Sequence, residues 1–369
     1  MRKRIFDISL SVTVGALIFG IGAGVLLLPK RTFSENENRM LSSLSIPTVG
    51  ELLEGELSTS VGEFYRDHIP LREGLIAIKA CTELALMKGE NNGVLFCDDG
   101  YLLKKGEYES LVLARENLSF LSGIKELCEK NSVSAVTAFA PRGIDVMEGK
   151  LPYLYVGEQS RIYDLVGDAG IDLVTPIRCA AENGEYVWYR TDHHWTARGA
   201  YTAYRALSEA LSFEPYGEEY FTVSQVSDEF FGSVYSSVGC VASESDSIEL
   251  YRYGEDGDYT VSIPESGETH KGFYFSEWLS KKDKYAVFFG GNYPVLTVEK
   301  GNEKRERLLI IKDSFANSLA PFLALHFDIV LVDPRYYNEG EDGILRLIEA
   351  ADRVLILCGI DTVASTRLY

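Results

Sequence analysis

The stretch that decides the fold reads Leu308-Leu309-Ile310-Ile311-Lys312-Asp313-Ser314-Phe315, an apolar run that leads directly into a serine and the start of a helix. The C-terminal part of the chain repeats this pattern. Its predicted strands lie at 308–312, 329–332 and 354–358, and its predicted helices at 314–326 and 343–351. Strands that are apolar throughout and alternate with amphipathic helices are typical of a parallel sheet covered on both faces. This part of the sequence therefore predicts an α/β fold.

The segments upstream extend the pattern and then interrupt it. In chain order, the spacing predicts a helix at 108–130, a strand at 133–140, a helix at 157–168, a strand at 171–175 and a helix at 196–211. Between 213 and 300 the sequence changes to short strands rich in Gly, Ser and Tyr, which predicts an antiparallel insertion. Nearer the N-terminus, 63–87 has helical spacing broken by Pro70, and 93–103 is typical of a hairpin with a glycine turn.

The N-terminus carries Arg2, Lys3 and Arg4 ahead of an uncharged run from Ile8 to Leu28. In a helix that rises 1.5 Å per residue, this run spans about 30 Å, the hydrocarbon thickness of a bilayer. The basic residues predict a cytoplasmic N-terminus by the positive-inside rule. A cleaved signal peptide is the alternative, but its apolar region would be shorter and would end in a small-residue cleavage site. We expect an uncleaved single-pass anchor in the cell membrane, with the bulk of the chain outside the cytoplasm.

The composition excludes some classes of function. The chain has 369 residues, of which 46% are hydrophobic and 25% charged, a globular composition. It contains 36 Lys and Arg against 55 Asp and Glu, a formal net charge of −19, which argues against nucleic acid as a partner because phosphate binding depends on basic residues. The six cysteines show no CxxC spacing, which argues against a cysteine metal site and leaves disulfide pairing open. Cys358 lies in an apolar run and is expected to be a core residue.

Two of the five histidines are adjacent, in Tyr189-Arg190-Thr191-Asp192-His193-His194-Trp195. A carboxylate two residues from an imidazole can orient the ring and stabilise its protonated form, as a catalytic base requires. The alternatives are a helix start capped by Asp192 with a surface histidine, or a zinc site. Zinc is disfavoured because the two adjacent side chains should point apart and no His-rich or Cys-rich partner follows. In an extended segment, Asp192 and His194 would share one side and His193 would point away.

Ser314 is the second candidate for chemistry. At the carboxyl edge of a parallel sheet, the turn after a strand exposes a hydroxyl in the crevice where ligands bind. The N–H groups at the start of the following helix can stabilise a developing oxyanion. An ordinary helix cap is the alternative interpretation. Because the chain supplies both halves of a triad, we predict Ser314 as nucleophile, His194 as general base and Asp192 as the residue that holds the imidazole.

This constellation is similar to the periplasmic alginate O-acetyltransferase proteins and their Gram-positive relatives named for the Asp-His-His-Trp motif, all of which are SGNH-hydrolase-like. In this family the Asp-x-His element precedes the serine, and the present chain has that order. Other segments that resemble the family, over nearly the whole exported chain, are Glu37-Asn38-Arg39, Tyr65-Arg66-Asp67-His68-Ile69-Pro70-Leu71-Arg72, Gly93-Val94 with Gly100-Tyr101-Leu102, Pro141-Arg142 before Leu151-Pro152, and Phe230-Phe231-Gly232-Ser233. The resemblance implies a three-layer α/β/α fold of SGNH-hydrolase type with a parallel central sheet.

Two departures from ordinary SGNH hydrolases concern the oxyanion site. Those enzymes have Gly-Asp-Ser at the nucleophile, whereas this chain has Lys312-Asp313-Ser314. Their oxyanion-hole Asn follows a strand as Gly-x-Asn-Asp, whereas Cys358-Gly359-Ile360-Asp361-Thr362 offers no Asn. The backbone N–H of Ser314 is one expected donor, and the second is open.

Three further residues are candidate substrate contacts. Arg335 is the candidate for a substrate or oxyanion contact, with a surface arginine in a loop as the alternative, and Trp195 and Tyr336 are candidates beside it.

With the resemblance, the sequence predicts O-acyl transfer, with acetyl as the expected acyl group, to hydroxyls of a cell-envelope or exported polysaccharide through an acyl-serine intermediate. A polysaccharide acetylesterase would use the same triad, and a non-catalytic glycan-binding envelope protein is the alternative from another class. The chemistry needs no cofactor and no metal, and the resembling systems imply a multi-spanning membrane acyltransferase as acyl donor. We expect an anchor at 1–29, a linker and helical segment at 30–90, and a catalytic domain at 91–369 that includes the insertion at 213–300.

Overall fold

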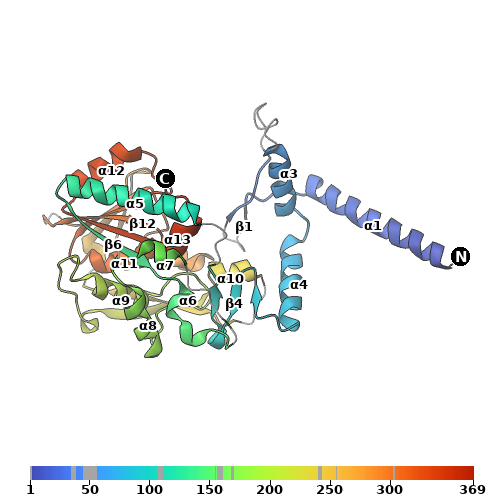
Figure 1. The fold of residues 1–369 in the computed structure, drawn as a ribbon, viewed down its shortest axis with the longest axis horizontal. Helices are drawn as coiled ribbons and strands as arrows, with labels where there is room; N and C mark the ends of the chain where they lie inside the picture. Colours follow the sequence, from blue (N-terminus) through green and yellow to red (C-terminus); the bar gives the residue numbers. More distant parts are fainter. Residues whose placement is uncertain are drawn as a thin grey trace. The chain divides into compact units, whose positions relative to one another are not determined.

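The apolar strands around Ser314 lie in one seven-stranded sheet with the strand order β10-β9-β11-β13-β12-β14-β6 (Figure 1). This computed structural model describes residues 2–34, 39–44, 56–106, 111–153, 155, 161–167, 170–239, 243–254, 256–301 and 304–369. The strands of the sheet are β6 (Ser134–Ala140), β9 (Tyr259–Ile263), β10 (Glu268–Lys271), β11 (Val295–Lys300), β12 (Arg307–Lys312), β13 (Asp328–Val332) and β14 (Arg353–Gly359).

The sheet is mixed, which corrects the prediction of a parallel central sheet. Strands β13, β12, β14 and β6 pair in parallel, whereas β11, β9 and β10 pair antiparallel on the other side of β13. The predicted insertion therefore contributes three strands to the main sheet. For β9 and β10 the reason lies in their connection, because a parallel pair needs a crossover of a dozen or more residues, whereas only residues 264–267 join these two strands.

Helices cover both faces of the sheet, as a three-layer α/β/α arrangement requires. Alternate residues of β12 serve the two layers, because Leu308 and Ile310 belong to one core cluster and Leu309 and Ile311 to the other. The first cluster packs against α8 (Val174–Glu182), α9 (Ala197–Leu207) and α11 (Phe315–Leu323), which lie on one face (Figure 1). The second packs against α5 (Val112–Lys130), α7 (Arg161–Val166), α12 (Gly340–Glu349) and α13 (Ile360–Ser365).

Most of the predicted elements are present with shifted ends, and one is wrong. The strand expected at 171–175 is reduced to a single bridge between Ile171 and Ala138, and α8 begins at Val174. The Asp172 carboxylate accepts a hydrogen bond from the backbone N–H of Thr175, and proline is tolerated in a first helical turn, so Pro176 does not prevent the helix. The starts of the helices expected at 108–130 and 157–168 lie partly outside the described residues.

Three smaller sheets are described besides the main one. The predicted hairpin is confirmed, with β4 (Val94–Phe96) paired to β5 (Leu102–Lys104) and β3 (Glu90–Asn91) added at its edge. Strands β7 (Thr222–Phe230) and β8 (Asp246–Arg252) form an irregular antiparallel pair. Strands β1 (Phe33–Ser34) and β2 (Arg39–Met40) pair antiparallel in the third small sheet. Two short α-helices are α6 (Gly143–Val146) and α10 (Ser233–Val238).

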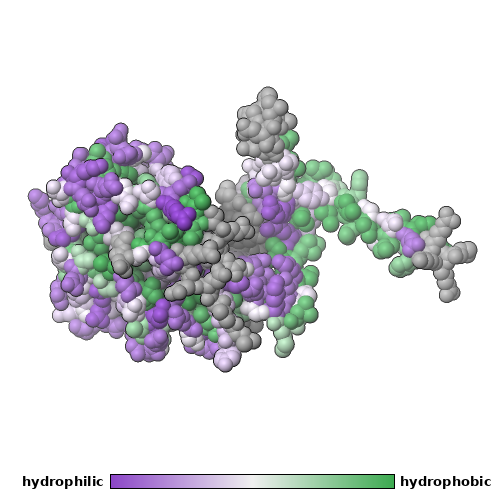
Figure 2. Space-filling model, in the orientation of Figure 1, coloured by the Kyte–Doolittle hydropathy of each residue, from purple (hydrophilic) through white to green (hydrophobic). Residues whose placement is uncertain are grey.

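The chain divides into two units, one made of residues 1–88 and 235–241 and the other of residues 89–234 and 242–369. The first contains α1 (Arg2–Leu27), α3 (Glu56–Asp67) and α4 (Arg72–Ala85), so the helical spacing interrupted at Pro70 is confirmed. Helix α1 is hydrophobic over most of its length (Figure 2), and Ile5–Leu27 is long and apolar enough to cross a membrane. Of the predicted motif at 37–39, only Arg39 lies within the described residues.

The sequence did not predict which cysteines form disulfide bonds. Cys81 is disulfide-bonded, whereas Cys97, Cys128, Cys179 and Cys358 carry free thiols. Cys358 is completely buried, as predicted for a core residue.

Candidate active site

Two loops at the carboxyl edge of the main sheet bring Ser314, His194 and Asp192 into one hydrogen-bonded series. Ser314 lies between β12 and α11, and the two other residues lie in the loop before α9. The Ser314 Oγ is 2.7 Å from His194 Nε2, and His194 Nδ1 is 2.6 Å from Asp192 Oδ1. These distances are those of direct hydrogen bonds between a hydroxyl, an imidazole and a carboxylate. Residues 120 positions apart in the sequence thus form the geometry that a nucleophile and its base require.

The turn that carries Ser314 is held by the residue before it. Asp313 is completely buried, and its two carboxylate oxygens accept hydrogen bonds from the backbone N–H groups of Phe315 (3.0 Å) and Gly359 (2.7 Å). Gly359 has to be a glycine here, because a Cβ would lie 2.7 Å from the Phe315 ring. Ser314 itself is half-buried, and its backbone N–H has no hydrogen-bond acceptor among the described residues. The site therefore leaves both the hydroxyl and one backbone donor available to a ligand.

Asp192 is buried and surrounded by donors. Its Oδ1 also accepts the backbone N–H of His194 at 3.0 Å, and its Oδ2 accepts the backbone N–H of Ser233 at 2.7 Å. Gly232 packs directly against it, since a Cβ there would lie only 2.3 Å from the Asp192 carboxylate. Burial by itself raises the pKa of Asp192, but the imidazoles of His193 and His194 and these hydrogen bonds outweigh burial and hold it well below its usual range. The carboxylate therefore stays ionised beside the imidazole.

Another buried carboxylate, Asp246, contacts the loop that carries Asp192 and was not predicted. It accepts hydrogen bonds from the backbone N–H groups of Arg190 (2.7 Å) and Thr191 (2.8 Å), and from the hydroxyls of Thr191 and Tyr186. The Thr191 hydroxyl in turn accepts the backbone N–H of Gly232 at 3.0 Å. Burial raises the pKa of Asp246. No sequence signal could have singled it out, because it is one of 55 acidic residues and starts an ordinary strand.

The His194 ring is fixed by aromatic packing. Tyr285 stacks on it in parallel, with ring centroids 3.9 Å apart, and Phe315 meets it edge-on at 5.0 Å. The Tyr285 hydroxyl donates to the backbone carbonyl of Ser314 at 3.0 Å, so one residue contacts both His194 and Ser314. Tyr285 comes from the region predicted as an insertion, and no motif pointed to it.

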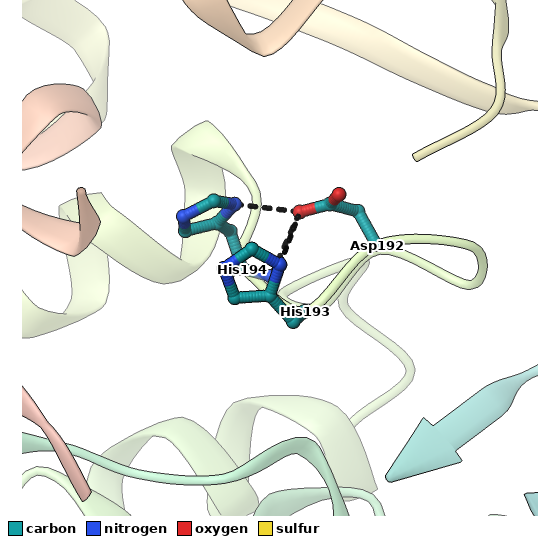
Figure 3. Close-up of side chains that lie close together, drawn as sticks. All are labelled: Asp192, His193 and His194. Carbon is teal, nitrogen blue, oxygen red and sulfur yellow. Dashed lines mark hydrogen bonds and ion pairs between the residues drawn. The ribbon is translucent and has the colours of Figure 1, made fainter. Parts of the chain in front are cut away.

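His193 does not point away from its neighbours, contrary to the expectation for an extended segment. Its ring centroid is 3.8 Å from that of His194, and its Nδ1 lies 3.6 Å from Asp192 Oδ1 and 2.6 Å from Ser233 Oγ (Figure 3). The backbone bends at residues 191–194, so the alternation of side chains in a strand does not apply. Loss of water contact and the neighbouring His194 lower the pKa of His193 well below its usual range, although Asp192 opposes the shift.

Asp192, His193 and His194 also form a group that could hold a metal ion, since their ligand atoms lie within 4.8 Å of one another. Both Nδ1 atoms are directed at the same carboxylate oxygen (Figure 3). A zinc ion holds ligands at about 2.0–2.2 Å in a tetrahedron, which separates two of them by well over 3 Å. The 2.6 Å between His194 Nδ1 and Asp192 Oδ1 is a hydrogen-bond distance instead. The donor arrangement fits an oriented base better than a metal centre.

The three predicted substrate contacts have different surroundings. Arg335 is bidentate to the buried Asp333 through Nε (2.8 Å) and Nη2 (2.6 Å), and its guanidinium lies over the Tyr336 ring, which is 52% exposed. Trp195 is completely buried, and its Nε1 donates to Ser318 Oγ at 2.9 Å. Trp195 therefore does not make the expected substrate contact, because its ring is packed in the core beneath the site.

The family comparison matches this region of the chain. The model for the family described as DHHW protein matches residues 160–333, which include both the Asp192–Trp195 motif and Ser314. The resemblance to the DHHW proteins is confirmed. A curated relative from Pseudomonas syringae pv. tomato, named a probable alginate O-acetylase AlgJ, is 25% identical over 186 residues, which is 47% of this chain and 47% of that protein. The chain thus matches about half the length of this relative.

Solved structures agree on the fold. A DHHW protein from Eubacterium siraeum superposes with a TM-score of 0.63 at 21% identity, covering 76% of this chain and 94% of that one. Bacillus cereus PatB1, solved with a sulfonyl adduct, superposes with a TM-score of 0.62 at 18% identity, covering 75% and 99%. The larger unit therefore has the architecture of DHHW proteins and of PatB1.

Proposed function

We propose that the chain is a membrane-anchored extracytoplasmic O-acyltransferase, with acetyl as the acyl group, that acts on hydroxyls of a cell-envelope or exported polysaccharide. The observation that carries the proposal is the series Ser314–His194–Asp192 with hydrogen bonds of 2.7 and 2.6 Å. A non-catalytic glycan-binding protein has no need of a buried, ionised carboxylate aligned behind an imidazole and a half-exposed serine.

The chemistry follows from these contacts. Ser314 Oγ attacks the carbonyl carbon of an acyl ester while His194 Nε2 takes its proton, and a C–O bond forms as the carbonyl oxygen becomes an oxyanion. The intermediate collapses with expulsion of the donor alcohol, which receives the proton from His194, and leaves acyl-Ser314. A sugar hydroxyl then attacks the acyl-serine after His194 removes its proton, and the acyl group moves to the sugar as the Ser314 hydroxyl is restored. Asp192 holds the imidazole in the required tautomer throughout.

The proposals of a polysaccharide acceptor and of an acyl donor rest on the resemblance to related proteins. The curated relative is named an alginate O-acetylase, and a polysaccharide acceptor is proposed for this chain by analogy. Arg335 and Tyr336, which lie together after β13, are proposed to contact the sugar or the acyl group. A multi-spanning membrane acyltransferase is proposed as donor. If water replaced the sugar in the second step, the same residues would make a polysaccharide acetylesterase.

Anchoring by α1 is proposed from the length and apolarity of Ile5–Leu27. The protein should stay with membranes after a carbonate wash, and an added protease should reach its bulk from outside the cell. Recovery of a soluble mature form cut near residue 29 would favour a signal peptide and contradict the anchor.

The nucleophile is tested by Ser314→Ala in the purified full chain. The variant should lose turnover of a small acetyl ester and should form no covalent adduct with a sulfonyl fluoride, as read by intact mass. Its unfolding transition should change little, because a serine at a helix start contributes about 1–2 kcal/mol at most. Ser280→Ala, at an exposed serine with only a local hydrogen bond, is the matched control. Parent-level turnover by Ser314→Ala would refute the assignment, and transfer to an added oligosaccharide separates a transferase from an esterase.

A further inference from the structure

The position where ordinary SGNH hydrolases place their oxyanion-hole Asn offers no side-chain donor here. Strand β14 ends at Gly359, and the chain continues with Ile360 at the start of α13. The backbone N–H of Gly359 is used by Asp313 at 2.7 Å, and Ile360 is completely buried. At this turn, the backbone N–H of Ser314 has no acceptor among the described residues and is available as one donor. An oxyanion is stabilised by at least two convergent donors. The second donor has to come from another loop.

The loop before β11 reaches the same edge of the sheet from the other side. Because β11 runs antiparallel to β13, its first residue, Val295, pairs with Val332 at the end of β13. This places residues 289–294 beside the carboxyl ends of β13 and β12, where Ser314 lies. The loop has an unusual backbone, with positive φ at Phe289 (61°), Gly290 (80°) and Gly291 (118°). A non-glycine residue at positive φ is strained and is retained where the surroundings require it, often at functional sites.

The side chain of Asn292, the residue after these three, is hydrogen-bonded through its amide oxygen only, among the described residues. Lys312 Nζ donates to Asn292 Oδ1 at 2.7 Å, and Asn317 Nδ2 donates to the same oxygen at 3.2 Å. Lys312 is buried and also donates to Asn317 Oδ1 at 2.9 Å, so the three side chains form a closed set. Asn292 is exposed, and its Nδ2 has no acceptor among the described residues. The buried Lys312 ammonium thus fixes the orientation of the Asn292 amide, so that its N–H groups face solvent.

The direction of that amide follows from the geometry of α11. At about 100° per residue, Ser318 and Asn317 lie on either side of Ser314 around the helix axis. The Ser318 side is the side of the base, because the Ser318 hydroxyl contacts Trp195 Nε1 and the Tyr285 hydroxyl, and Tyr285 stacks on His194. The Asn317 side faces the Gly291 carbonyl (3.2 Å) and Asn292. Asn292 therefore contacts α11 on the Asn317 side, whereas Trp195 and Tyr285 contact it on the Ser318 side.

We propose that Asn292 Nδ2 is the second donor of the oxyanion hole, acting with the backbone N–H of Ser314, and that Lys312 and Asn317 are positioning residues that orient this amide. The proposal rests on the acyl-transfer function above. It also accounts for Lys312 in place of the glycine that ordinary SGNH hydrolases have two residues before the nucleophile, since no glycine could hold the Asn292 oxygen. Arg335, with Nε and Nη2 committed to Asp333, is left to contact the substrate rather than the oxyanion.

The test is Asn292→Ala in the purified full chain, assayed for steady-state turnover of a small acetyl ester. Loss of one oxyanion donor should lower kcat about 10²–10³-fold with little change in KM, because the hydrogen bond forms only in the transition state. Asn183→Ala is the matched control, since this exposed asparagine makes no side-chain hydrogen bond among the described residues. Asn183→Ala should unfold with the parent, whereas Asn292→Ala should remain folded but unfold at a lower temperature, because it removes one acceptor of the buried Lys312 ammonium.

The positioning role has its own readout. Asn317→Ala should lower kcat about tenfold with KM unchanged, and the double variant Asn292→Ala/Asn317→Ala should be no slower than Asn292→Ala alone, because both act through one donor. A merely structural role would make the losses additive, which would overturn the positioning claim. Turnover by Asn292→Ala within threefold of the parent, while Ser314→Ala is inactive, would overturn the oxyanion assignment alone. Equal rates for the parent and Ser314→Ala would instead refute the proposed function, and this inference with it.

Discussion

Gly232→Ala should damage the site through a single contact. A Cβ at this position would lie 2.3 Å from both Cβ and Oδ2 of Asp192 and 2.6 Å from its Cγ. Non-bonded heavy atoms prefer separations of about 3.5–4.0 Å, so the carboxylate would have to retreat by about 1 Å. Asp192 Oδ1 is 2.6 Å from His194 Nδ1, so the retreat would break or misalign that hydrogen bond. A displacement of about 1 Å at a catalytic group costs about 10²-fold in rate, and we expect kcat to fall by that factor.

The assay is steady-state turnover of a small acetyl ester, together with circular dichroism and thermal unfolding. Gly123→Ala is the matched control, because this glycine lies in α5 and a Cβ there would meet nothing within 4 Å. It should leave turnover unchanged and raise the stability by about 1 kcal/mol, the helix preference of Ala over Gly. Normal turnover by a folded Gly232→Ala variant would refute the reasoning, because it would mean that the position of Asp192 does not limit the rate.

Three further predictions address single side chains. His194→Ala should lower kcat about 10²–10⁴-fold, the usual contribution of a general base, and His193→Ala should cost much less; equal losses that added zinc restores would indicate a metal site. Asp246→Asn should lower kcat at least tenfold and the free energy of unfolding by about 1–3 kcal/mol, because an amide N–H₂ would face the backbone N–H groups of Arg190 and Thr191. A variant with parental kcat and stability would show that the loop conformation does not depend on Asp246. Burial lowers the pKa of Lys312 to about 8, against an ordinary value of 10.5, although Asp333 opposes the shift. Between these two pH values Lys312 binds a proton in the unfolded chain but not in the folded one. The difference in unfolding free energy between the parent and Lys312→Met should therefore rise with pH in favour of the parent, by up to about 3 kcal/mol from pH 8 to 10.5. A difference that does not change with pH would contradict a lowered pKa of Lys312.

The local pattern of the sequence was enough to predict the elements that carry the site. Strand β12 and helix α11 follow from an apolar run that ends at a serine, because burial on both faces leaves no polar alternation in the strand. The prediction of the strand at 171–175 was wrong, since the Asp172 side chain and the tolerance of proline in a first turn favoured a helix. The sheet was predicted to be parallel because the pattern indicates which segments are strands but not how they pair. The antiparallel pairing of β9 with β10 follows from their short connection at 264–267.

The sequence by itself therefore determined what neighbouring residues share: an apolar segment long enough to span a membrane, an Asp-x-His element and a serine between a strand and a helix. The tertiary structure alone decided which distant residues complete the site. Asp246 reaches the loop from a different strand, Tyr285 stacks on the base, and Asn292 meets Lys312 across the edge of the sheet. None of these three has a local signature, because a carboxylate, a phenol or an amide acquires its role from the donors and acceptors that the fold places around it, and a linear pattern contains no such distances.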